Sequence, residues 1–90
     1  MQPEIILYTK DYCPYCQRAK ALLTAKGLTY TEFEVADNPE KFAEMMQRSN
    51  GGRTVPQIFI GDIPIGGAMD MFALDEAGKL DPLLKLQPAT

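Results

Sequence analysis

Apolar and polar positions alternate along the chain between strand patterns and helix patterns. Residues 5–8 form a continuous apolar run, which is typical of a strand covered on both faces. From about residue 14 to residue 26, apolar residues recur at helical spacing, and Gly27 is suited to a left-handed C-cap. Residues 29–35 alternate, so we expect a half-buried strand with Phe33 on one face and Glu32 on the other.

The second half of the chain begins with a helix signal. Asn38-Pro39 supplies an N-cap residue followed by proline at the first helical position, and Asn50-Gly51-Gly52 ends the helix. Residues 57–60 then predict a buried strand. Gly61-Asp62 predicts a hairpin turn, and Pro64 places the following strand at an edge because proline cannot donate a ladder hydrogen bond.

The last part of the chain is predicted to be helical. A third helix is expected over about residues 68–77, with Gly78 as its cap, then a short helical segment around Leu80 and a frayed end at 87–90. The order is β-α-β-α-β-β-α with a right-handed first crossover. This order predicts an α/β fold: a four-stranded mixed sheet, order 2-1-3-4, with strand 3 antiparallel and helices on both faces.

Length, composition and charge narrow the possible functions. Ninety residues, 46% of them hydrophobic and 23% charged, fit one globular domain over 1–90. The net charge of −3 argues against a nucleic-acid partner, and no apolar run reaches membrane-spanning length. The first four residues lack the basic and apolar regions of a secretory signal, so we expect a cytoplasmic protein.

Cys13 and Cys16 are the only cysteines, and they lie where the first strand gives way to the first helix. A C-x-x-C pair in this setting is typical of a redox dithiol. Pro14 fits the first helical position, so Cys13 would face the unpaired N–H groups that favour a thiolate. Lys10 adds a nearby positive charge, while Asp11 acts in the opposite direction. Cys16 is within one turn of Cys13, close enough for a disulfide.

Other uses of the cysteine pair fit less well. A structural disulfide that closes so short a loop stabilises little. A structural zinc site needs four ligands, and the chain has two cysteines and no histidine. The absence of histidine also removes Ser-His and Cys-His triads. Redox chemistry is therefore the favoured interpretation.

Several motifs occur in a characteristic order along nearly the whole chain. They are Thr9-Lys10, Cys13-Pro14-Tyr15-Cys16, Thr54-Val55-Pro56, Gly66-Gly67 and Leu80-Asp81-Pro82-Leu83-Leu84. In this order and spacing the chain resembles a glutaredoxin of the thioredoxin fold, most closely the short dithiol members. The resemblance implies Cys13 as nucleophile, Cys16 as resolving thiol and glutathione as co-substrate, with no metal required.

The resemblance also implies a glutathione site. Its residues would be Lys10, Tyr15, Arg53, Thr54, Val55, Pro56, Gln57, Gly67, Ala68, Met69 and Asp70. The Val55 backbone would pair with the cysteinyl part of glutathione as an added strand, beside Pro56, which resembles the family's cis proline. Lys10 and Gln57 resemble groups near the glycine carboxylate, and which of Arg48 or Arg53 joins them stays open.

The γ-glutamyl end of glutathione would lie at the start of the third helix. Backbone groups of Gly67, Ala68 and Met69 would meet its carboxylate, and Asp70 its amine. The chain departs from the family pattern here, because Ala68-Met69 replaces a pair whose second member often carries a hydrogen-bonding side chain. The loop at residues 50–52 also looks slightly longer than usual.

The sequence thus predicts a monomeric, glutathione-dependent oxidoreductase that reduces disulfide-containing and glutathionylated proteins. One alternative is a dimer that holds an iron–sulfur cluster through Cys13 and glutathione. Another is a glutaredoxin-like electron donor reduced by thioredoxin reductase. Absorption spectra of protein purified aerobically and anaerobically test the first alternative, because an iron–sulfur cluster is coloured. Turnover coupled to glutathione and glutathione reductase, compared with turnover coupled to thioredoxin reductase, tests the second.

Overall fold

A four-stranded mixed sheet forms the centre of the computed structural model, which describes residues 3–11 and 13–84. The strands are β1 Ile5–Thr9, β2 Thr31–Glu34, β3 Gln57–Ile60 and β4 Ile63–Gly66. Their order is β2-β1-β3-β4, with β1 parallel to β2 and antiparallel to β3. The predicted order and directions are confirmed, and the frayed end predicted at 87–90 lies outside the described residues.

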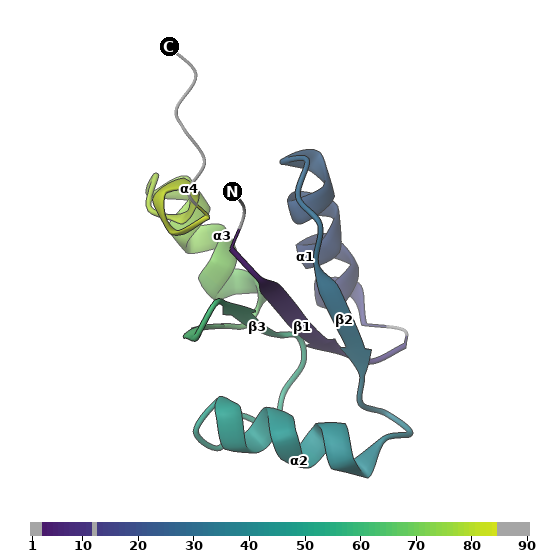
Figure 1. The fold of residues 1–90 in the computed structure, drawn as a ribbon. Helices are drawn as coiled ribbons and strands as arrows, with labels where there is room; N and C mark the ends of the chain where they lie inside the picture. Colours follow the sequence, from purple (N-terminus) through teal and green to yellow (C-terminus); the bar gives the residue numbers. More distant parts are fainter. Residues whose placement is uncertain (1–2, 12, 85–90) are drawn as a thin grey trace.

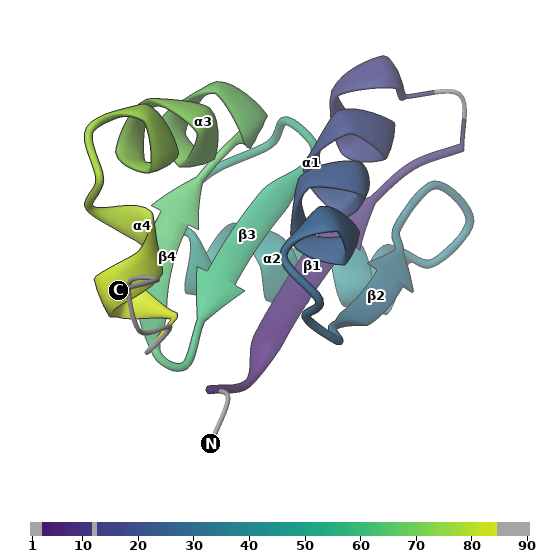
Figure 2. The ribbon, with the colours of Figure 1, turned by 90° about the horizontal axis from the view of Figure 1, so that it is seen from above.

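Helices cover both faces of this sheet. They are α1 Pro14–Ala25, α2 Pro39–Arg48, α3 Ala68–Glu76 and α4 Leu80–Leu83. α1 and α3 lie on one face and α2 on the other (Figures 1 and 2). Because both faces of β1 are covered, all five of its residues are buried. None of the helices in the described ranges is long and apolar enough to cross a membrane.

Alternation along β1 divides the core into two clusters. Ile5 and Leu7 pack in the cluster beneath α1 and α3, while Ile6 and Tyr8 pack in the cluster that contains Met45 of α2. Since successive side chains of a strand point to opposite faces, Thr9 falls on the same face as Ile5 and Leu7. The face of β1 that meets α1 is therefore also the face that leads to the cysteines.

The edge strands differ slightly from the sequence prediction. The strand expected at 29–35 is confined to Thr31–Glu34, because its ladder runs only against β1, from Ile6–Thr31 to Thr9–Glu34. At the other edge, β4 carries Pro64 and pairs with β3 through a register shift between Ile58 and Phe59. The edge position of the proline strand is confirmed.

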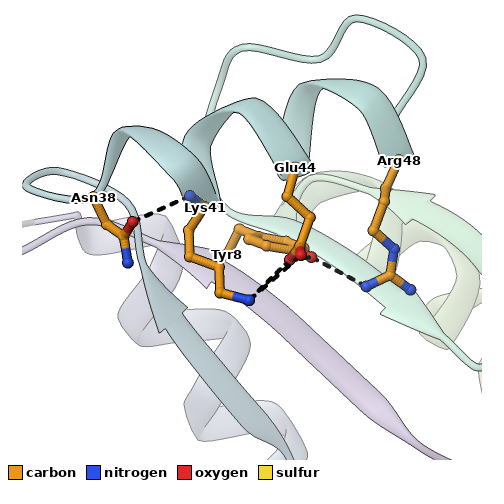
Figure 3. A network of polar contacts seen from close by, with 5 residues as sticks. All are labelled: Tyr8, Asn38, Lys41, Glu44 and Arg48. Carbon is orange, nitrogen blue, oxygen red and sulfur yellow. Dashed lines mark hydrogen bonds and ion pairs between the residues drawn. The ribbon is translucent and has the colours of Figure 1, made fainter.

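A polar network fastens α2 to the central strand. The Tyr8 hydroxyl donates to Glu44 Oε2 at 2.5 Å and accepts from an Arg48 guanidinium nitrogen at 3.0 Å (Figure 3). Lys41 pairs with Glu44, and Asn38 Oδ1 caps the helix by accepting from the Lys41 N–H. The fully buried Tyr8 side chain thus has its one polar atom satisfied by two charged groups.

We expect Tyr8→Phe to lower the free energy of unfolding by about 1.5 kcal/mol, the lower end for hydrogen bonds to charged groups. Urea denaturation measures this change, with Tyr15→Phe as the control because Tyr15 is exposed. An unchanged midpoint for Tyr8→Phe would show that the network contributes nothing to stability.

Candidate active site

Cys13 occupies the N-cap of α1. Its backbone is extended, Pro14 follows in the first turn, and its Sγ accepts the N–H of Cys16 at 3.2 Å. A sulfur in this position meets the unpaired N–H groups and the positive end of the helix dipole, which favour a thiolate. Cys13 is partly exposed, and its thiol lies 3.8 Å from the carbonyl oxygen of Val55. The predicted helix-start setting of Cys13 is confirmed.

Cys16 lies in a different environment although it is only one turn away. Its side chain is fully buried, and this burial, together with the neighbouring Cys13, raises the pKa of the Cys16 thiol to about 12. The backbone N–H of Lys10 and the charge of Lys20 act in the opposite direction. The two thiols are thus inequivalent, with Cys13 accessible and Cys16 shielded from solvent.

The loop between α2 and β3 brings a backbone edge to the cysteines. The Val55–Pro56 peptide bond is cis. The Gln57 side chain is buried and donates from Nε2 to the Thr54 carbonyl at 2.9 Å. Further back, the Ser49 hydroxyl accepts the Gly52 N–H at 2.9 Å. These contacts fix the course of the loop, and Gln57 faces the loop's own backbone.

The start of α3 forms the opposite wall. Gly67 is the N-cap residue, and Asp70 Oδ2 accepts the Gly67 N–H at 2.8 Å. Gly66 has a φ of +105°, a conformation that favours glycine, and a Cβ there would lie 2.5 Å from Asp70 Oδ2, so a side chain would displace this carboxylate. Asp70 therefore caps its own helix. The sequence analysis missed this contact, although an acid three residues after the N-cap is the spacing of a capping box.

A groove of about 160 Å³ lies between these two walls and the start of α1. It is lined by Tyr15, Thr54, Val55, Pro56, Gly67, Ala68, Met69 and Asp70. The groove thus brings together residues from three separate segments that the sequence analysis assigned to one site. Tyr15 and Met69 are 48% and 64% exposed, so its rim carries two accessible apolar side chains.

The remaining predicted site residues lie outside the lining of the groove. The Lys10 ammonium is 5.7 Å from the centre of the Phe42 ring, and Arg53 is exposed on the loop before Thr54. Arg48 belongs to the Tyr8 network and lies 4.8 Å from the Phe59 ring centre. Among residues 3–11 and 13–84, no three cysteine, aspartate, glutamate or histidine side chains gather as a metal site.

Fold and site together define a thiol–disulfide oxidoreductase of the thioredoxin-like class, and the comparisons name its family. The Glutaredoxin family model matches residues 5–65. Glutaredoxin 3 of Escherichia coli is 56% identical over 79 residues, which cover 88% of this chain and 94% of that protein. The chain belongs to the glutaredoxin family, whose members are glutathione-dependent thiol–disulfide oxidoreductases.

Solved structures agree with this assignment. A glutaredoxin from Brucella melitensis is 47% identical with a TM-score of 0.79, covering 99% of this chain and 96% of its own. A buckwheat glutaredoxin–glutathione complex is 35% identical with a TM-score of 0.81, covering 92% of this chain and 77% of its own. The chain is a glutathione-dependent dithiol oxidoreductase with the glutaredoxin fold.

We expect an alkylating reagent to modify Cys13 alone in the reduced, native protein at neutral pH. Cys16 is buried and its pKa is raised, so its thiolate is scarce and shielded, and only the thiolate reacts. Peptide mass spectrometry after a short treatment with iodoacetamide measures the two sites, and unfolding in denaturant should expose both. Equal labelling of both cysteines in the native protein would contradict their inequivalence.

Proposed function

We propose that this glutaredoxin reduces protein disulfides and glutathione mixed disulfides, with Cys13 as nucleophile and Cys16 as resolving thiol. The observation that carries the proposal is the groove beside Cys13, which runs from the Val55–Pro56 backbone to the start of α3. Its wall at Val55–Pro56 and its helix N-terminus suit a short peptide with a terminal carboxylate. Glutathione is such a peptide.

The reaction follows from the positions of the two thiols. The Cys13 thiolate attacks a disulfide sulfur, and a mixed disulfide with Cys13 forms while the first thiolate leaves. Either Cys16 then attacks Cys13 and releases the second thiol, or glutathione does so directly. Two glutathione molecules reduce the Cys13–Cys16 disulfide in the first case, and glutathione disulfide is the final product.

Glutathione is proposed to lie with its cysteinyl part along the Val55 backbone, next to Cys13 and beneath Tyr15. Its γ-glutamyl carboxylate would accept from the N–H groups of Ala68 and Met69, because the Gly67 N–H is already bonded to Asp70. The γ-glutamyl amine would then meet the charge of Asp70.

The glycine carboxylate would lie toward Lys10 and Arg53. Arg53 is preferred to Arg48, because Arg48 is bonded to Tyr8 on the α2 face of the sheet. Gln57 would contribute to glutathione binding indirectly, because its side chain donates a hydrogen bond to the carbonyl of Thr54. Thr54 and Pro56 both line this side of the groove.

The proposed setting is a reducing compartment, the cytoplasm, where a C-x-x-C pair stays reduced between turnovers. The protein is proposed to act as a monomer, since one chain supplies both thiols and the whole groove. Its partners are disulfide-containing or glutathionylated proteins. No metal takes part in the proposed thiol exchange.

We expect Cys13→Ser to abolish all turnover, because no other thiol is accessible. Cys16→Ser should retain removal of glutathione from proteins and lose reduction of protein disulfides that need an internal resolving thiol. Turnover coupled to glutathione and glutathione reductase measures both, with thioredoxin reductase in a parallel assay. Equal loss of deglutathionylation in both variants would contradict the assigned roles, and faster turnover with thioredoxin reductase would contradict glutathione as co-substrate.

Asp70→Asn should raise the KM for glutathione about tenfold, because a charge-assisted hydrogen bond contributes roughly 1.5–3 kcal/mol and 1.4 kcal/mol is a factor of ten. The asparagine oxygen can still accept the Gly67 N–H, so the cap and the thermal stability should change little. Glu76→Gln, an exposed acid in the last turn of α3, is the matched control. A lower melting temperature with unchanged glutathione kinetics would mean that Asp70 serves only its helix.

A further inference from the structure

Three polar residues, Thr9, Lys20 and Glu32, meet between α1 and the sheet, outside the lining of the groove. The Thr9 hydroxyl donates to Glu32 Oε2 at 2.6 Å, and the Lys20 ammonium donates to the same oxygen at 3.0 Å. Thr9 is at the end of β1 and only 1% exposed, while Glu32 is on the neighbouring strand β2. Both strands run beneath α1, which carries Lys20 (Figure 2). The sequence analysis assigned no role to Lys20 or Glu32.

Lys20 is also next to the resolving thiol. It follows Cys16 by four residues on α1, and residues at this spacing are neighbours on one side of a helix. Glu32 pulls the ammonium toward the sheet, so the Lys20 side chain is only 20% exposed. The Lys20 charge therefore lies against the sheet face on which Cys16 is buried.

The charges within the set are well defined. The Thr9 hydroxyl and then Lys20 hold the pKa of Glu32 below its ordinary value, so Glu32 is a carboxylate at neutral pH. That carboxylate raises the pKa of Lys20, which therefore remains an ammonium. Glu32 is thus too weak a base to take the Cys16 proton, and the positive charge is the group that can assist Cys16.

Among the described residues, the groups that act on Cys16 besides Lys20 are Cys13 and the backbone of Lys10. Cys13 adjoins it at the helix start, and the backbone N–H of Lys10 reaches it from the end of β1. Glu32 of β2 and Tyr30, which precedes that strand, act on Lys20. On α3, the Asp70 carboxylate is bonded to the Gly67 N–H. Lys20 is thus the charged side chain whose electrostatic effect favours the Cys16 thiolate.

We propose that Lys20, held in place by Glu32 and Thr9, is a positioning residue for the second thiol exchange, in which it stabilises the Cys16 thiolate. The proposal rests on the roles proposed above for Cys13 and Cys16. In this step the Cys16 thiol releases its proton to water, and its sulfur attacks Cys13 Sγ. A Cys13–Cys16 bond forms, the bond from Cys13 to the substrate sulfur breaks, and the expelled thiolate takes a proton from water.

The same reasoning limits Lys20 to one branch of the reaction. The first attack uses Cys13, which lies at the N-cap of α1 and whose Sγ accepts the Cys16 N–H. Resolution by glutathione does not ionise Cys16. Lys20 therefore favours the dithiol route over the glutathione route and influences which disulfides the protein reduces through Cys16.

A model disulfide with a coloured aromatic thiol separates the two exchanges. One equivalent of this disulfide is mixed rapidly with the reduced protein. The attack of Cys13 releases one coloured thiol and leaves the other bound to Cys13 as a mixed disulfide. The attack of Cys16 on Cys13 then releases the second coloured thiol. We expect Lys20→Met to slow the second release about tenfold at neutral pH, the effect of one pKa unit in the attacking thiol. The pH midpoint of that phase should rise, and the first release should be unchanged, which also shows that the variant is folded.

Matched variants make the test specific. Lys20→Arg keeps the charge and should restore the second phase, whereas Lys41→Met removes a lysine from the α2 face and should leave both phases unchanged. A second phase that Lys20→Met does not slow, or equal slowing of both phases, would overturn the Lys20 proposal. Cys16→Ser should release one coloured thiol, and a second release from that variant would refute the Cys16 role instead.

Discussion

The hydrogen bond from the Cys16 N–H to Cys13 Sγ is the contact on which the chemistry of this protein depends. It exists because Cys13 is the N-cap of α1 and Pro14, the first residue of the helix, is in a position where a missing N–H costs nothing. The same turn of helix that presents Cys13 to solvent buries Cys16 completely. One short segment thus produces an accessible sulfur with anion-stabilising N–H groups and a shielded sulfur three residues later.

The sheet keeps this turn in place and assigns different tasks to its two faces. On the α2 side, Tyr8 joins Glu44 and Arg48 and fastens the helix to β1 (Figure 3). On the α1 side, the next residue of β1, Thr9, bonds to Glu32, which in turn holds Lys20. Because side chains alternate along a strand, one residue step separates a network that fastens α2 to the sheet from one that links α1 to it.

The groove beside Cys13 is built from segments that lie far apart in the chain. Val55 and Pro56 arrive from the loop before β3, held through Thr54 by the buried Gln57 amide. Gly67 and Ala68 arrive from the start of α3, where Gly66 leaves room for the Asp70 carboxylate. The exposed Met69 gives the rim of the groove an apolar side chain, next to Asp70 in the lining.

The sequence by itself determined the dithiol, the helix start at Cys13, the strand order and the edge position of Pro64, because each follows from local spacing or from chain order. Only the tertiary structure decided that β2 begins at Thr31, that Gln57 turns to its own loop and that Arg48 belongs to the Tyr8 network. The hydrogen bonds among Thr9, Glu32 and Lys20 could not be predicted from the sequence either. Hydrogen-bond partners far apart in the chain leave no periodic signal, since their meeting depends on the register between strands and on how each helix lies over the sheet.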